Sequence, residues 1–247
     1  KKDKLLVNVY GKEEEMGDAA ANFVSEQLQS AIREKGSANL ILATGASQFS
    51  FVEALKNKKL DWDKITVFHL DEYKGLPEKH PASFRKYLKE RILDAVNPGE
   101  IYFINGNADN LNEEAERYEN LLKKHPVDVA CIGIGENGHI AFNDPPVADF
   151  NDPRWVKVVE LDEDCKKQQV GEGWFSNIDQ VPKEALTLTI PAIMHCKTIS
   201  CAVPGERKQQ AINNTLNGPI NTDCPASVLR THPNTVIFLD AKALQSI

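Results

Sequence analysis

The sequence predicts an α/β fold: a single Rossmann-like domain over residues 1–247, with a mainly parallel sheet and helices on both faces. Short apolar segments alternate with amphipathic segments of helical period along nearly the whole chain. No stretch rich in Pro, Gly and Ser divides the 247 residues into two domains. Sheets of this kind bind ligands beyond the carboxyl ends of their strands, so the loops that follow strands are the expected place for chemistry.

Four strand–helix pairs are predicted in the first half of the chain. The strands are expected over residues 5–10, 40–43, 65–70 and 102–104. The helices are expected over residues 16–35, around 51–55, over 83–93 and over 113–123. In the first helix Ala20, Val24 and Leu28 recur at helical spacing, and Gly36 is a typical helix stop.

The second half continues the alternation. Strands are expected over residues 127–134, 156–161, 186–190, 199–203 and 236–239. A helix that contains Ala211, Ile212 and Thr215 lies between the last two strands. Residues 143–154 are dense in Asp, Asn and Pro and have no helical period, which predicts a loop or lid.

Charge and composition exclude several classes of protein. Lys and Arg number 29 and Asp and Glu number 36, so the net charge of −7 argues against a nucleic-acid partner. The apolar runs are far shorter than the roughly 20 residues that span a bilayer, and the charged N-terminus has no apolar core behind it, so we expect no membrane segment and no signal peptide. Five cysteines without a C-x-x-C pair indicate reduced thiols and a cytoplasmic location.

The first candidate loop, Thr44, Gly45, Ala46 and Ser47, joins a buried strand to a helix. Glycine lets the backbone approach a ligand closely, and the helix behind it offers unpaired amide groups to an anion. The alternative is an ordinary turn with a Ser or Thr cap, which this segment alone favours.

The second candidate loop places two carboxylates, Asp71 and Glu72, at the end of the strand over residues 65–70. Adjacent carboxylates are costly unless they are solvated, paired or functional. One of them can act as a general base. A solvated pair that caps a turn is the equally weighted alternative.

The third candidate loop spells G-x-G-x-x-G over residues 133–138, directly after a strand. This is the dinucleotide fingerprint, and Glu160 and Asp162 lie at about the distance of the ribose-binding acid, so an NAD-dependent enzyme is a rival interpretation. The missing feature is the helix, because Pro145, Pro146 and Pro153 leave no room for one.

The glycines therefore indicate a loop that presents His139 and Asp144. A carboxylate five residues after a histidine can form an acid–base pair with it, although an isolated histidine beside glycines is often only a loop residue.

The fourth candidate loop holds Arg207 and Lys208, which follow the strand over residues 199–203 and open a helix. Cations at a helix N-terminus oppose the macrodipole, so they are better explained as facing an anion than as solvated side chains. No metal site is predicted, because the six histidines are scattered and show no metal-ligand spacing.

These four loops, in this order, resemble the glucosamine-6-phosphate deaminase (isomerase) family, whose superfamily includes 6-phosphogluconolactonase. The lactonases differ after the Asp-Glu pair, where they have an Arg, and after Gly-His, where they have a Thr-Ala-Ser run. The resemblance covers almost the whole chain, and the matching segments are residues 42–47, 70–77, 135–145 and 181–187, together with Lys208.

The resemblance implies ring opening of an amino-sugar 6-phosphate, proton transfer from C2 to C1, and loss of ammonia, without a cofactor or metal. By matching position, Asp71 is the C2 base and His139 assists ring opening, oriented by Asp144. The catalytic set also includes Asn137 and Glu72. The substrate- and phosphate-binding set is Thr44, Gly45, Ala46, Ser47, Gly138, Lys208 and Arg207. A homo-oligomer is possible, since relatives include hexamers.

Three departures from the family leave the sugar open between glucosamine 6-phosphate and an epimer such as galactosamine 6-phosphate. Asn137 stands where the family usually has Asp, and Asp144 where it has Glu. The phosphate-binding Arg is missing from residues 170–175, and Arg207 or Arg230 is the candidate replacement.

Two alternatives remain besides the NAD-dependent enzyme: a lactone hydrolase of the same superfamily and a non-catalytic sugar-phosphate sensor. A sensor of the transcription-regulator kind needs a basic helix-turn-helix module, and we expect none before Leu5. The presence of Asp71, His139 and Asp144 also favours an enzyme.

Overall fold

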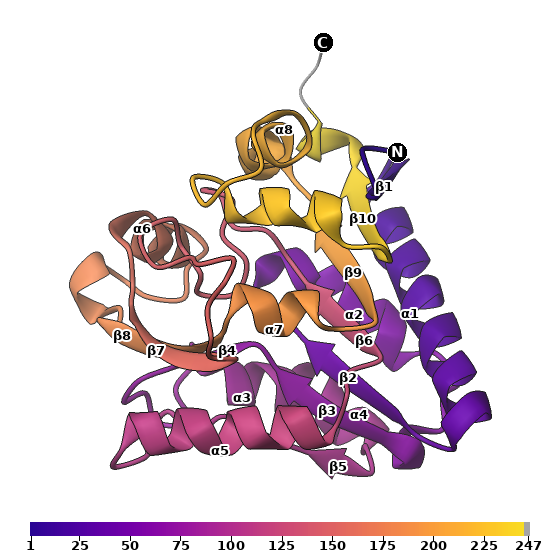
Figure 1. The fold of residues 1–247 in the computed structure, drawn as a ribbon, viewed down its shortest axis with the longest axis horizontal. Helices are drawn as coiled ribbons and strands as arrows, with labels where there is room; N and C mark the ends of the chain where they lie inside the picture. Colours follow the sequence, from indigo (N-terminus) through magenta and orange to yellow (C-terminus); the bar gives the residue numbers. More distant parts are fainter. Residues whose placement is uncertain (245–247) are drawn as a thin grey trace.

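Seven parallel strands form the main sheet of the protein in a computed structural model that describes residues 1–244. Figure 1 shows this sheet running through the centre of the molecule. In sheet order the strands are β1 (Leu6–Tyr10), β10 (Thr235–Asp240), β9 (Thr198–Val203), β6 (Val129–Ile132), β2 (Ala38–Leu42), β3 (Ile65–His69) and β5 (Glu100–Ile101).

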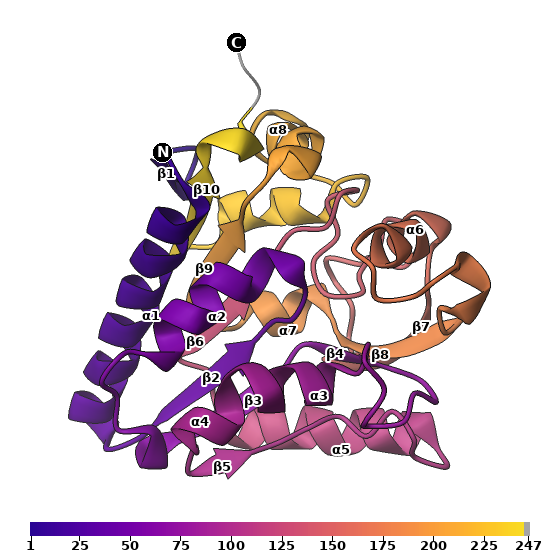
Figure 2. The ribbon, with the colours of Figure 1, turned by 180° about the vertical axis from the view of Figure 1, so that it is seen from behind.

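Successive residues of the central strands face opposite layers of helices. In β2, Leu40 and Leu42 pack into one apolar cluster and Ile41 into the other. One layer consists of α1 (Glu13–Lys35), α2 (Phe49–Lys56), α3 (Phe84–Leu88), a π-helical turn (Lys89–Leu93) and α4 (Asp94–Val96); the other contains α5 (Leu111–Lys124), α7 (Ile190–Met194) and α8 (Gln209–Asn217). Figures 1 and 2 show the two layers from opposite sides. The predicted α/β class, with helices on both faces, is confirmed.

The first helix illustrates how the sequence sets an element's limits. Its buried residues include Met16, Ala20, Val24 and Leu28, which lie on one stripe of the helix. Three glutamates in the first turn and two basic residues in the last turn suit the helix dipole. Gly36 ends the helix in the left-handed region, with φ of 81°, as predicted.

A second sheet of three antiparallel strands lies beside the mainly parallel sheet that the sequence predicts, and the sequence does not predict this second sheet. Its strands are β4 (Asp71–Tyr73), β8 (Glu184–Leu188) and β7 (Val156–Glu160), in the order β4-β8-β7. The strands predicted over residues 156–161 and 186–190 are present as β7 and β8, although β8 begins two residues earlier and ends at Leu188. They pair with each other, and β8 also pairs with β4. Apolar content shows that a segment is a buried strand; it does not show which strand it pairs with.

The chain crosses from one sheet to the other at Leu70, between β3 and β4. The carbonyl of Leu70 accepts a hydrogen bond from the amide of Leu188 at 2.8 Å, which starts the second sheet immediately after the first. A third apolar cluster covers the second sheet and includes Tyr73, Phe142 and Phe175.

Two more elements differ from the prediction. The strand expected over residues 102–104 lies at 100–101, because the amide of Ile104 donates to the imidazole of His69 and leaves the ladder. The helix α6 (Glu163–Gly171) was not predicted, because Cys165 and Val170 are its only large apolar side chains. The loop predicted over residues 143–154 is confirmed. Within residues 1–244, no helix has the length and apolar character that crossing a bilayer requires.

Gly106, in the loop between β5 and α5, provides a test of how closely this loop packs on β4. A Cβ atom at this position would stand 2.0 Å from the carbonyl oxygen of Tyr73. We expect Gly106→Ala to lower the free energy of unfolding by about 1–3 kcal/mol, since backbone must move to make room. The control is Gly11→Ala, whose Cβ meets only the Glu15 side chain, at 3.5 Å. Equal urea midpoints for the two variants would contradict this packing.

Candidate active site

The four candidate loops meet at one cleft of about 550 Å³ at the carboxyl edge of the main sheet. Its walls include the turn after β2, Asp71 after β3, the glycine-rich loop after β6 and Lys208 after β9. This is the edge where an open parallel sheet binds ligands. The structure therefore brings these four segments to one place, while their role in chemistry stays a prediction.

The turn after β2 exposes backbone to the cleft. Gly45 has φ of 103° and precedes a 3₁₀ turn, Ala46–Gln48, that leads into α2. Thr44, Gly45 and Ser47 line the cleft, whereas Ala46 does not. Neither the 3₁₀ turn nor α2, both fully described, begins with a side-chain cap, so the alternative of a Ser/Thr-capped turn is not supported.

Hydrogen bonds hold this turn against its neighbours. The hydroxyl of Tyr87 donates to the carbonyl of Gly45 at 2.9 Å. The amide of the Gln48 side chain donates to Ser47 Oγ at 3.0 Å and to the carbonyl of Ala202 in β9 at 3.1 Å. The turn is thereby fixed beside the strand that leads to Lys208.

The two predicted cations have different environments. Lys208 lines the cleft, is buried, and donates from Nζ to the carbonyl of Ile134 at 2.8 Å. Burial lowers the pKa of its ammonium group, while the charge of Glu172 opposes that shift. Arg207 does not line the cleft; its side chain is half exposed, and its guanidinium pairs with Glu136 at 2.6 Å.

Arg230, the other candidate for the missing arginine, lies against a different part of the chain. Its guanidinium pairs with Asp3 at 2.7 Å and donates to the carbonyl of Gly218 at 2.6 Å. Neither Arg207 nor Arg230 therefore extends its guanidinium into the cleft in this structure.

Asp71 lies where the chain changes sheets, and its carboxylate lines the cleft. Its exposed fraction is only 8%. Burial raises the pKa of its carboxyl well above 3.8, and the negative charges of Glu72 and Asp144 raise it further. A carboxylate with a raised pKa is a stronger base than an exposed aspartate.

Glu72 points away from the cleft and holds β4 to the start of α3. Its carboxylate is fully buried and accepts amide hydrogens from Tyr73, Phe84 and Arg85 at 3.0, 3.3 and 3.1 Å. The Nε of Arg85 adds a contact at 3.2 Å. Burial raises the pKa of this carboxyl, and the arginine opposes the shift. The alternative of a solvated pair is wrong, because Asp71 and Glu72 are both buried; we interpret Glu72 as a positioning residue.

The glycine-rich loop presents His139 without a following helix, as predicted. Gly138 has φ of 85°, and a Cβ there would stand 2.7 Å from the Cys224 sulfur. A Cβ at Gly135 would stand 2.0 Å from the ring of His139. These glycines permit a tight loop under the imidazole, and Gly138 itself does not line the cleft.

His139, Asn137 and Asp144 form a compact polar group, in which His139 alone lines the cleft. His139 Nδ1 lies 2.6 Å from Asn137 Oδ1 and 3.1 Å from Asp144 Oδ1. The Asn137 side-chain amide donates to Asp144 Oδ1 at 3.0 Å. Burial opposes ionisation of Asp144, but the neighbouring His139 and the hydrogen bonds from His139 and Asn137 together keep the pKa of its carboxyl below 3.8. Asp144, the carboxylate predicted to orient the imidazole, thus lies beside His139, and Asn137 bridges the two side chains.

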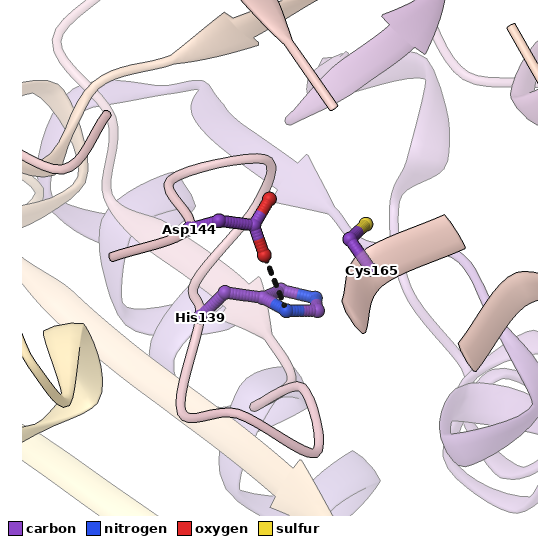
Figure 3. Close-up of side chains that lie close together, drawn as sticks. All are labelled: His139, Asp144 and Cys165. Atoms are coloured by element: carbon purple, nitrogen blue, oxygen red, sulfur yellow. Dashed lines mark ion pairs between the residues drawn. The ribbon is translucent and has the colours of Figure 1, made fainter. Parts of the chain in front are cut away.

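Sequence reasoning missed the wall formed by α6 and the residues after it. Gln168, Gln169 and Glu172 line the cleft, and Gln168 Oε1 accepts the amide of Glu136 at 2.8 Å. Cys165, on the same helix, lies beside His139 and Asp144 (Figure 3). Nothing in this polar segment, which lacks a helical apolar period, distinguishes it from an exposed loop.

One cleft at the carboxyl edge of the parallel sheet thus brings together the buried carboxylate of Asp71, the imidazole of His139 and the buried ammonium of Lys208. A family model described as "Glucosamine-6-phosphate isomerases/6-phosphogluconolactonase" matches residues 11–238, and the chain belongs to this family.

Curated relatives and a solved structure agree with that assignment. The chain is 35% identical over 231 residues to a glucosamine-6-phosphate deaminase of Bacillus cereus (strain B4264), which covers 94% of this chain and 85% of the relative. It is 36% identical, with the same coverage, to the deaminase of Bacillus thuringiensis (strain Al Hakam). A structure described as a monomeric glucosamine-6-phosphate deaminase matches with a TM-score of 0.88 and 33% identity, covering 96% of this chain and 98% of that one.

A 6-phosphogluconolactonase structure from Shewanella baltica OS155 has the same fold. It matches with a TM-score of 0.80 and 19% identity, covering 98% of this chain and all of that chain. At this identity the match concerns the fold.

The raised pKa of Asp71 predicts a pH-dependent effect on stability. The folded protein binds the Asp71 proton more tightly than the unfolded chain, so stability decreases as the pH rises from about 3.8 through the raised folded pKa. We therefore expect Asp71→Asn to have a higher Tm than the wild type at pH 7, and the same Tm at about pH 3. Calorimetry across this range is the measurement. Asp63→Asn, at an exposed position, should change Tm little at either pH; a less stable Asp71→Asn at pH 7 would contradict the assignment.

Proposed function

We propose that this protein is an amino-sugar 6-phosphate deaminase that converts glucosamine 6-phosphate, or a close epimer, to a ketose 6-phosphate and ammonia. The observation that carries the proposal is that one cleft joins Asp71 and His139 to Lys208 and to the turn containing Gly45. A sugar 6-phosphate carries its charge at one end and its reacting carbons at the other, so it requires an anion pocket and an acid–base pair in one cleft.

The phosphate would occupy the end formed by Thr44, Gly45, Ser47 and Lys208. Backbone amides at a glycine turn before a helix attract an anion, and a buried ammonium adds a charge-assisted contact. Holding the phosphate leaves C1 and C2 of the sugar to reach the other end, where binding places them beside the acid–base groups.

The acid–base groups then have separate tasks. His139, held by Asn137 and Asp144, transfers a proton between the ring oxygen and the C1 hydroxyl, which opens the ring. Asp71 removes the C2 proton as a base and returns a proton to C1, and the electron pair moves to form an imine at C2. Water adds to that carbon and ammonia leaves, so that sugar phosphate and one water yield ketose phosphate and ammonia.

A lactonase activity is the second candidate, supported by the shared fold. The two positions that separate the deaminase and lactonase patterns are in contact here: Tyr73 and Phe142 lie with ring centroids 5.3 Å apart. Both belong to the apolar cluster that covers the second sheet. An arginine at position 73 would bury a charge in that cluster, so the packing beneath the cleft favours the deaminase.

The direct test is ammonia release from a panel of amino-sugar 6-phosphates, together with the lactone 6-phosphogluconolactone. We expect ammonia from at least one amino sugar and its loss by about 10²–10⁴-fold in Asp71→Asn, since a positioned base is removed while the shape is kept. Solvent deuterium incorporation into the product should decrease in parallel.

The same Asp71→Asn variant should still bind the sugar phosphate. The exposed variant Asp63→Asn serves as the matched control and should retain full activity. Hydrolysis of the lactone without ammonia release from any amino sugar would overturn the proposal in favour of the lactonase.

Lys208→Ala tests the phosphate end of the cleft. Losing a charge-assisted hydrogen bond of about 1.5–3 kcal/mol should raise KM for each phosphorylated substrate by roughly 10- to 150-fold, with a smaller change in kcat. Lys242→Ala removes an exposed lysine and should leave KM unchanged. Arg207→Ala should have a smaller effect than Lys208→Ala, because Glu136 already holds that guanidinium. If Lys208→Ala keeps the wild-type KM, the phosphate lies elsewhere.

A further inference from the structure

A buried thiol that the proposed reaction does not use lies beside the acid–base pair. Cys165 comes from α6, whereas His139 and Asp144 come from the glycine-rich loop and its continuation. One ligand atom from each of the three side chains lies within 4.8 Å of the others. Figure 3 shows the three side chains converging, with Asp144 and Cys165 on different sides of the imidazole.

The carboxylate of Asp144 is incompletely satisfied. Its Oδ1 contacts His139 and Asn137, but its Oδ2 has no hydrogen-bond partner among residues 1–244, although the side chain is 1% exposed. An unpartnered buried carboxylate oxygen is costly, so this oxygen is a ready ligand for a cation.

We propose that Cys165, His139 and Asp144 form a binding site for a thiophilic divalent cation such as Zn²⁺ or Cd²⁺. Sulfur, imidazole nitrogen and carboxylate oxygen are the donors that zinc prefers, and they lie about 2.0–2.3 Å from it, which places tetrahedral ligands somewhat more than 3 Å apart. The present cluster, whose ligand atoms lie within 4.8 Å of one another, would contract on binding the cation. His139 lines the cleft, so the fourth ligand position can be filled by water from that side.

Binding would proceed by exchange of a proton for the metal. The S–H bond of Cys165 breaks, the sulfur–metal bond forms, and the proton passes to solvent. The two negative charges then supplied by Cys165 and Asp144 balance the charge of the cation.

Occupancy of this site would block proton transfer by His139. A metal bound to His139 and Asp144 occupies the imidazole that transfers the proton and the carboxylate that holds it, so the cation acts as an inhibitor. This consequence rests on the proposed function, whereas binding of the cation does not. Cys165 is the ligand to substitute in a test, since neither His139 nor Asp144 can be changed without altering the proposed reaction.

Binding is tested with Cd²⁺ alone, added to chelator-treated protein, by the ultraviolet charge-transfer absorption of a cadmium–thiolate bond. We expect one equivalent to produce this band in the wild type. Cys165→Ala should lose it, while Cys131→Ala, which removes another buried thiol, in β6, should keep it. A wild type without the band, or an unchanged band in Cys165→Ala, would overturn the site.

Inhibition is tested with Zn²⁺ in the ammonia-release assay. Cys165→Ala should keep the metal-free kcat and require at least about tenfold more Zn²⁺ for half-inhibition, since it lacks one metal ligand. Cys131→Ala should match the wild type, and a chelator should restore activity in each case. Equal inhibition of wild type and Cys165→Ala would overturn the inhibitory role. If the wild type releases no ammonia, the proposed function fails and the cadmium titration still decides the site.

Discussion

The buried carboxylate of Glu72 is the constraint on which the active site depends. Three backbone amides and the Arg85 guanidinium converge on it, and together they join β4 to the start of α3. Removing one partner of such a buried pair typically costs about 3–5 kcal/mol, because the other charge is left uncompensated. Asp71 precedes Glu72 on the same three-residue strand, so this network determines where the candidate base stands.

The two aspartates of the site have opposite electrostatic environments. Asp71 is buried beside other negative charges, which raise the pKa of its carboxyl. Asp144 is also buried, but His139 and Asn137 stabilise its charged form and lower its pKa. Carboxylates whose environments separate their pKa values in this way are typical of sites that divide acid–base tasks. In the proposed reaction, the burial of Asp71 therefore strengthens the base at the expense of stability.

How far the sequence predicts each segment depends on the physical signal that the segment carries. The β2 segment is a short apolar run and α1 has apolar residues at helical spacing, and the sequence predicts both with their correct type. The cleft follows from a general rule about strand ends, which is enough to bring Thr44, Asp71, His139 and Lys208 to one edge of the sheet. Pairing in the second sheet depends on distant segments meeting across the fold, which no local pattern records. The environments of Glu72 and Cys165 cannot be predicted for the same reason, since distant segments determine how each side chain is buried and what it contacts.

The polar helix α6 has a consequence for how such a site can diversify. It contributes Gln168 and Gln169 to the wall of the cleft, whereas the turn after β2 and Lys208 follow strands of the main sheet. Under the proposed function, the phosphate and the rest of the sugar are thus contacted by separate parts of the fold. Changes in the part that carries α6 can alter which epimer fits while the anchor and the core of the sheet stay intact. A fold arranged in this way can change its substrate selectivity while its main sheet stays the same.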